Sequence, residues 1–135
     1  MITVSTELTL DIAKAFGVYM IAGGLSGLIA PGRWVGVIDE FKDRPGLTYM
    51  SGVFVYVIGV AIIFAHNIWT DALSGFISFV GWAAAFEGLL IIALPNLLLN
   101  FVKAILRPWL ITAFAISVII LGVLLTAIGF TGAVG

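Results

Sequence analysis

The chain has 135 residues, of which 62% are hydrophobic and only 10% are charged, and its mean hydropathy is +1.25. Soluble domains carry about 25% charged residues, so a chain this apolar is expected in a membrane. The net charge of −1 excludes the basic footprint of a nucleic-acid-binding protein. The absence of cysteine excludes disulfides, thiolate metal sites and cysteine nucleophiles.

Four stretches of the chain have the roughly 20 apolar residues that a helix needs to cross a bilayer. We predict spanning helices over residues 12–30, 47–66, 72–94 and 108–130. Helices are favoured because the backbone polar groups of a span must be satisfied internally, and no period-2 alternation is present. The first span is expected to be permanent, since residues 1–11 contain no lysine or arginine and so lack the basic region of a signal peptide.

Two long connectors, residues 31–45 and 95–107, are predicted to form short amphipathic helices in the membrane interface. Each has an apolar stripe at helical spacing, formed by Trp34, Val37, Ile38 and Phe41 in the first and by Leu97, Leu98, Phe101 and Ile105 in the second. The connector between the second and third spans is a short turn. In this turn Asp71 or Thr70 is predicted to cap the third span.

An internal repeat relates the two halves of the chain. Gly17, Gly24, Leu25 and Pro31 recur 64 residues later as Gly81, Gly88, Leu89 and Pro95, and Arg44-Pro45 recurs 63 residues later as Arg107-Pro108. Each half is therefore predicted to contain a span, an interfacial segment closed by Arg-Pro, and a second span. Two spans per half predict a parallel repeat whose pseudo-axis lies along the membrane normal.

The basic residues predict the orientation of the chain. The two long connectors contain Arg33, Lys42, Arg44, Lys103 and Arg107, whereas only Lys14 lies on the other side. The positive-inside rule places both connectors in the cytoplasm and both termini outside, which we assign to a bacterial inner membrane. The five connector residues are also candidates for binding lipid headgroups, although setting the topology is their simpler role.

Each predicted span carries two glycines seven residues apart: Gly17 and Gly24, Gly52 and Gly59, Gly81 and Gly88, Gly122 and Gly129. Seven residues are close to two helical turns, so each pair lies on one helix face. Helices in lipid associate by close packing over small residues, so these faces are expected to be packing seams of one compact bundle or of contacts with another subunit. The simpler alternative is that glycine is common in spans. Gly23 and Gly27 add a GxxxG motif that could contact a second copy.

Glu87 is the candidate ionisable residue within the membrane. It lies well inside the third predicted span, where a carboxylate is costly unless it is protonated, paired, or facing water or the bundle interior. It is expected on the packed side of the helix, beside Gly88. It could bind a proton or a cation, or it could have a structural role, hydrogen-bonded to a neighbouring helix or paired with Lys103.

The turn after the second span contains a polar and aromatic motif of His66, Asn67, Trp69 and Asp71. His66 continues the spacing of Gly52 and Gly59 and is expected to face the bundle. It could act as a pH-sensitive switch or a metal ligand, or it could simply close the helix by bonding to Asp71 or the backbone. Asn67 is predicted to end the helix in a left-handed conformation, and Trp69 is expected to anchor the turn at the interface.

No catalytic site is predicted. Ser74, His66 and Asp71 supply the residue types of a hydrolase, but no nucleophile-elbow sequence accompanies them. No phosphate loop, HExxH, haem or flavin signature is present either. We therefore expect a protein that is not an enzyme and that uses neither a metal nor a cofactor.

A set of motifs across residues 16–95 resembles a family of small bacterial four-span inner-membrane proteins of unknown function. The set comprises Pro45, Tyr49-x-x-Gly52, the turn His66-Asn67-x-Trp69, Gly81-Trp82 in the following span, Gly88 and Pro95. The resemblance implies a membrane location and brings no activity with it. Members of the family often carry a basic residue at the position of Glu87, so the resemblance implies no family-wide proton-carrying role there.

The predicted fold is an all-α integral membrane protein of one domain. Its four transmembrane helices are expected to form a compact bundle, built as two repeated helix pairs with two short interfacial helices. The expected function is helix packing, as a homo-oligomer or as an accessory subunit of a larger inner-membrane complex. The alternatives are a small ion or solute transporter or channel subunit that uses Glu87, and lipid recognition by the basic connector residues.

Overall fold

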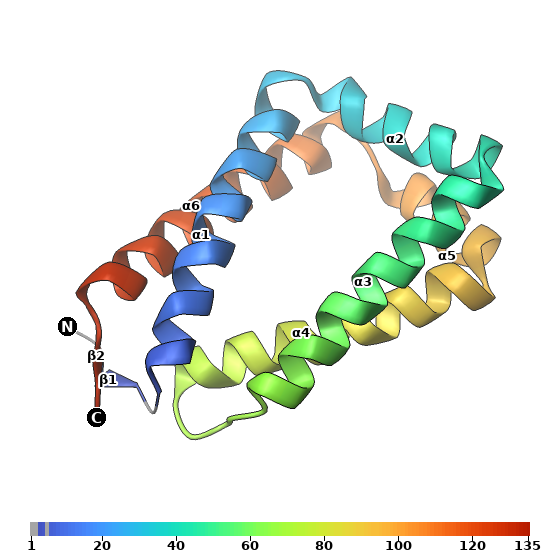
Figure 1. Ribbon diagram of the computed structural model, residues 1–135. Helices are drawn as coiled ribbons and strands as arrows, with labels where there is room; N and C mark the ends of the chain where they lie inside the picture. Colours follow the sequence, from blue (N-terminus) through green and yellow to red (C-terminus); the bar gives the residue numbers. More distant parts are fainter. Residues whose placement is uncertain (1–2, 5) are drawn as a thin grey trace.

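The computed structural model describes residues 3–4 and 6–135, and this part of the chain is almost entirely helical (Figure 1). Four long helices, α1 (Glu7–Ile29), α3 (Pro45–Ala65), α4 (Ala72–Ala93) and α6 (Pro108–Thr131), alternate with the shorter α2 (Pro31–Asp43) and α5 (Pro95–Ile105). The strands β1 (Thr3–Val4) and β2 (Ala133–Val134) pair in parallel at the two ends of the chain. The four long helices are long and apolar enough to cross a membrane, which confirms the all-α prediction and its four candidate spans.

All four prolines of the chain are the first residues of helices: Pro31, Pro45, Pro95 and Pro108. Proline suits this position because its missing N–H would have no partner there and its fixed φ is already helical. Its ring also drives the preceding residue out of the helical region, as at Ala30 (φ −137°) and Leu94 (φ −135°). The prolines therefore divide each half of the chain into long, short and long helices.

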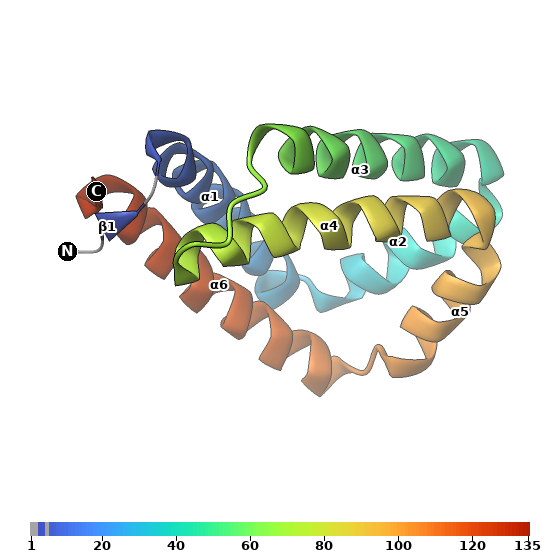
Figure 2. The ribbon, with the colours of Figure 1, turned by 90° about the horizontal axis from the view of Figure 1, so that it is seen from below.

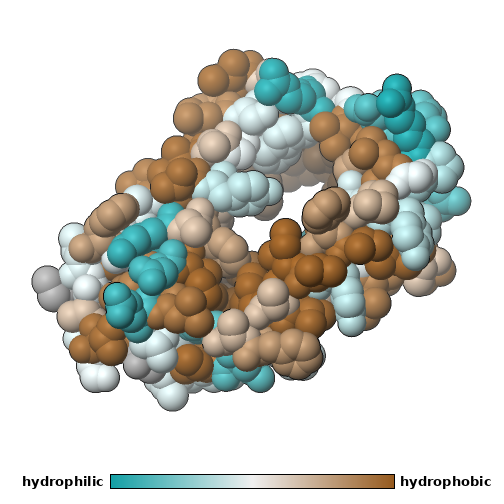
Figure 3. Space-filling model, viewed as in Figure 1, coloured by the Kyte–Doolittle hydropathy of each residue, from teal (hydrophilic) through white to brown (hydrophobic). Residues whose placement is uncertain are grey.

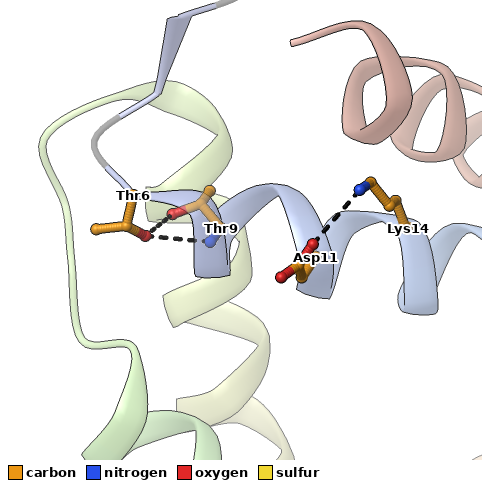
Figure 4. Close-up of polar contacts among 4 residues, drawn as sticks. All are labelled: Thr6, Thr9, Asp11 and Lys14. Carbon is orange, nitrogen blue, oxygen red and sulfur yellow. Dashed lines mark hydrogen bonds and ion pairs between the residues drawn. The ribbon is translucent and has the colours of Figure 1, made fainter. Parts of the chain in front are cut away.

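The first long helix begins at Glu7, earlier than the predicted residue 12. Thr6 caps it, since its side-chain oxygen accepts a hydrogen bond of 3.1 Å from the backbone N–H of Thr9 (Figure 4). Asp11 and Lys14 lie in the next two turns and form an ion pair at 3.4 Å, so the polar residues at this end fit within the helix. Capping and local pairing together explain the additional helical residues.

The long helices pack as two antiparallel pairs, α1 with α6 and α3 with α4 (Figures 1 and 2). Backbones approach closely within each pair. A side chain added at Gly88 on α4 would lie 2.5 Å from the backbone nitrogen of Tyr56 and 2.8 Å from the carbonyl oxygen of Gly52, both on α3. A larger residue at this position would not fit, because only glycine permits that separation of the two backbones.

Each of the eight stripe glycines faces the other helix of its own pair. The contacts of α1 with α6 involve Gly17, Gly24, Gly122 and Gly129, and those of α3 with α4 involve Gly52, Gly59, Gly81 and Gly88. The GxxxG motif behaves differently. Gly27 is covered by the indole ring of Trp34 from the same chain, whereas nothing lies within 4 Å of a side chain added at Gly23. The motif therefore does not form one free face for a second copy.

The two pairs meet only at their ends, so the bundle is less compact than predicted. At the hairpin end, which carries the 66–71 turn and the paired strands β1 and β2, α1, α4 and α6 share a core that includes Ala13, Ile77 and Leu125. At the bridge end, which carries α2 and α5, Lys103 forms an ion pair with Asp39. The space-filling view shows an opening through the molecule between the two pairs (Figure 3). The reason is that the glycines permit close approach within each pair and not between pairs.

We predict that Gly88→Ala destabilises the protein and that the matched change Gly23→Ala does not. The added methyl group at position 88 must push α3 and α4 apart, at a cost of about 1–3 kcal/mol, whereas the one at position 23 meets open space. Unfolding in mixed micelles, followed by circular dichroism, measures both free energies. Equal stability of the two variants would contradict the seam.

Candidate functional site

His66 is the largest of the fully buried polar side chains that the structure describes, with a relative exposure of 0%. Its Nε2 lies 2.6 Å from the hydroxyl oxygen of Thr9 on α1, and its Nδ1 lies 3.2 Å from the hydroxyl oxygen of Ser78 on α4. His66 itself follows the last residue of α3. We call these three residues the histidine node, because they join the two helix pairs with hydrogen bonds.

The hydroxyl group of Ser78 determines how protons are arranged in the node. Its single hydrogen faces the carbonyl oxygens of His66 and Ile68 at 2.9 and 2.8 Å, and its oxygen accepts from the N–H of Ile68 at 3.0 Å. The ring nitrogen Nδ1 of a neutral His66 must then donate to Ser78, which leaves Nε2 to accept the proton of Thr9. Thr9 in turn lies 2.8 Å from the hydroxyl oxygen of Thr6. Every polar atom of the imidazole therefore has a partner.

His66 was expected to face the bundle, and the structure confirms it. With both ring nitrogens engaged and the side chain fully buried, no lone pair of His66 is available to a metal. No group of three potential ligands among His, Asp and Glu occurs in the described part of the chain. The residue closes the helix end, as in the simpler interpretation, but its ring bonds to Ser78 and Thr9, where Asp71 or the backbone was expected, and so links helices.

The remaining turn residues have distinct local roles. Asp71 caps α4 as predicted, accepting a hydrogen bond of 2.9 Å from the N–H of Ser74 in a capping box. The prediction for Asn67 is wrong, because no non-glycine residue in the described chain has a positive φ. Instead, the side-chain oxygen of Asn67 accepts from the indole N–H of Trp69 at 2.7 Å and from that of Trp82 at 3.4 Å. It thus ties the turn to the first half of α4.

A cavity of about 830 Å³ lies between the helix pairs towards the bridge end. Side chains from α1, α2, α4, α5 and α6 line it, and nine of the thirteen are apolar, among them Trp34, Ile38 and Phe114. The polar lining residues are Tyr19, Ser26, Arg33 and Glu87. A largely apolar site of this size with few polar groups has the composition of a small-molecule or lipid site.

Glu87 lines this cavity instead of packing against a neighbouring helix. Its residue is exposed, and it forms no hydrogen bond or ion pair with any residue that the structure describes. The ion pair with Lys103, one of the alternatives for Glu87, does not form, because Lys103 pairs with Asp39. Gly88, the next residue, faces α3, so Glu87 is turned about 100° away from the packed face. An unpaired carboxyl group about 9 Å from the end of α4 is costly in lipid and requires a partner.

Two of the five basic connector residues form ion pairs, and one of the others lines the cavity. Lys103 is paired with Asp39, and Arg44 lies 3.8 Å from Glu40. Arg33 lines the cavity, where its guanidinium group lies 3.5 Å from the hydroxyl oxygen of Ser26. The other two headgroup candidates, Lys42 and Arg107, do not line this cavity. Arg33 is therefore the one cation of the five that the fold directs to the cavity beside Glu87.

No protein-family model, curated protein or solved structure matches this chain. The resemblance to a family of small four-span membrane proteins therefore stays a prediction. What the chain does must be inferred from its own geometry.

The sequence drew attention to His66 and Glu87 but not to the residues around them. Thr9 and Ser78 are ordinary helix residues in the sequence, and they become partners of His66 only through contacts between residues 57 and 12 positions apart. Ser26 was also not predicted as a site residue, because its contact with Arg33 is visible only in the folded chain. Their polarity on otherwise apolar helix faces was the one available clue.

We predict that Ser78→Ala lowers the free energy of unfolding by about 1–3 kcal/mol for each buried polar group that loses its hydrogen-bond partner. Ser117→Ala is the matched control, because the hydroxyl group of Ser117 is exposed and bonds only to Ala113 of its own helix. The control should change stability by less than about 0.5 kcal/mol. Unfolding free energies in mixed micelles compare the two variants, and similar values for both would contradict a stabilising histidine node.

Proposed function

We propose that this chain is a non-enzymatic, multi-pass membrane protein that holds a membrane amphiphile between its two helix pairs. The observation that carries the proposal is the cavity of about 830 Å³, whose lining is apolar apart from four side chains. The opening in Figure 3 is bounded by long helices on two sides and by the joined helix ends on the other two, so in a membrane it faces lipid sideways. An acyl chain could enter it without leaving the bilayer.

The size of the cavity suits a lipid-like guest. Its volume of about 830 Å³ lies within the range of about 300–1,000 Å³ that is usual for small-molecule sites.

A packing role with copies of the chain or with a larger inner-membrane complex was the first expectation from the sequence. The eight stripe glycines face partners within the chain, which removes the main argument for an intermolecular seam. Such a role would have to use other surfaces of the helices, such as the one at Gly23, where an added side chain meets open space. It remains a second proposal, and the measurement below also detects it.

A transport role for Glu87 has weaker support. Both ends of the opening are closed, one by the histidine node and the other by α2 and α5, whereas a transporter needs a path along the membrane normal. The unpaired carboxyl group is accounted for more simply as a contact to a bound guest.

We also propose that the two halves are structural repeats. The support is that the contacts recur with the sequence offsets. Gly24 of α1 approaches the carbonyl oxygen of Ala115 on α6, and Gly88 of α4 approaches the carbonyl oxygen of Gly52 on α3. The two glycines are 64 positions apart, and the two carbonyl groups are 63 positions apart. Asp39 and Lys103 are 64 positions apart and contact each other, as equivalent residues do near a two-fold axis. In this arrangement the axis passes between the helix pairs.

The proposed location is a bacterial inner membrane. With five of the six basic residues at the bridge end, the positive-inside rule places α2 and α5 in the cytoplasmic interface and both termini outside. The apolar residues Trp34, Val37 and Ile38 of α2 then face the cavity and the bilayer. Ion pairs such as Lys103 with Asp39 lie at the same end as the lipid headgroups.

The prediction that tests this function is retention of a lipid by the purified protein. Native mass spectrometry from a mild detergent should show the monomer carrying one phospholipid. Val37→Trp should remove most of the bound lipid because Val37 lines the cavity, whereas Val57→Trp, on an exposed face of α3, should not. Lipid-free protein, or equal loss in both variants, would contradict the proposal, and a stable dimer or a co-purifying chain would favour the packing role.

A further inference from the structure

The two corners where a long helix meets a short one differ in polarity, although the repeat makes them equivalent. The corner of α4 and α5 forms a second, smaller cavity lined by Leu90, Leu94, Leu97, Leu98 and Phe101. The residues 64 positions earlier are Ser26, Ala30, Arg33, Trp34 and Val37, and four of these five line the large cavity. One corner is therefore wholly apolar, and its counterpart carries a hydroxyl group and a guanidinium group.

Glu87 adds to the same difference. The residue 64 positions before it is Gly23, which faces open space. Both Glu87 and the polar pair Arg33 and Ser26 line the large cavity, although they come from different halves of the chain. The polar residues that break the repeat thus converge on one site. A guest made only of hydrocarbon would need none of them.

The charges in the cavity indicate the chemistry of the guest. Arg33 contributes one positive charge and Glu87 one negative charge, and neither forms an ion pair with a described residue. A guanidinium group is suited to a phosphate, which it can bind through two parallel hydrogen bonds. An unpaired carboxylate is suited to an ammonium group that carries N–H donors. The sum of the two charges is zero, which favours a headgroup with both signs.

We propose that the cavity binds a zwitterionic phospholipid with a primary ammonium group, such as phosphatidylethanolamine. The phosphate lies at Arg33 and Ser26, the ammonium group lies at Glu87, and an acyl chain occupies the apolar part of the cavity. This inference rests on the proposed lipid-binding function and specifies its ligand class. Phosphatidylcholine has the same charges but no N–H donor for Glu87. Phosphatidylglycerol has a phosphate but no cation to pair with Glu87.

The test is a competition between lipids with identical acyl chains, added in equal amounts to the delipidated protein and read by native mass spectrometry. The wild-type chain should retain phosphatidylethanolamine over phosphatidylcholine by about tenfold, the value of one additional hydrogen bond to a charged group. It should also retain phosphatidylethanolamine over phosphatidylglycerol. This comparison needs no variant, so it does not depend on any substitution folding correctly.

Two variants identify the residues responsible. Glu87→Gln keeps the size of the side chain but removes its charge, and it should bring the ratio of phosphatidylethanolamine to phosphatidylcholine close to one. Arg33→Gln should weaken binding of both lipids by about tenfold and leave their ratio unchanged. The matched controls are Glu40→Gln and Arg44→Gln, which remove the same charges from exposed positions outside the cavity and should alter neither quantity.

The outcomes separate the two levels of the proposal. Binding of lipid without preference among headgroups, or a preference for phosphatidylcholine or phosphatidylglycerol, would overturn the headgroup assignment and leave the lipid-binding function intact. A preference for phosphatidylethanolamine that survives Glu87→Gln would overturn the role of Glu87. Absence of any bound lipid would overturn both the function and this inference.

Discussion

Close backbone approach at glycine is the constraint on which this structure depends. In lipid, apolar side chains give helices no reason to associate, so association occurs where backbones can come together. In this chain such places lie on one face of each long helix, and they join α1 with α6 and α3 with α4. Because each stripe is used once, no stripe remains to bring the two pairs together along their length. The opening between the pairs follows from that distribution.

Contacts at the two ends connect the helix pairs and leave the opening between their middle parts unfilled. At the hairpin end, the histidine node replaces glycine packing with hydrogen bonds, since His66 continues the spacing of Gly52 and Gly59. At the bridge end, prolines start α2 and α5 and turn them across the opening, where Asp39 and Lys103 meet. We propose that the space between the two ends holds a lipid, whose headgroup is bound by Arg33 and the unpaired Glu87.

Local signals in the sequence predicted most of the secondary structure. Apolar length marked the four spans, and the polar turn before α4 offered Asp71 or Thr70 as its cap, of which Asp71 is used. The glycine spacing also predicted which faces would pack. It could not predict the partner of each face, because one stripe of glycine fits another equally well. The expectations for Glu87 and Asn67 were wrong because both depend on contacts between distant segments. Glu87 points away from the packed face because the neighbouring Gly88 faces α3. The side chain of Asn67 is held by the indole groups of Trp69 and Trp82.

We propose that lipid, and not protein, fills the space between the helix pairs. Nuclear Overhauser effects in nanodiscs, between acyl-chain protons and labelled methyl groups of the protein, measure this directly. We expect effects from lipid to Ile38 and Val102, which line the cavity, and none to Ile77, which is fully buried at the hairpin end. Direct effects between methyl groups of α3 and α6 at the middle of the helices, with none from lipid to Ile38 or Val102, would contradict it.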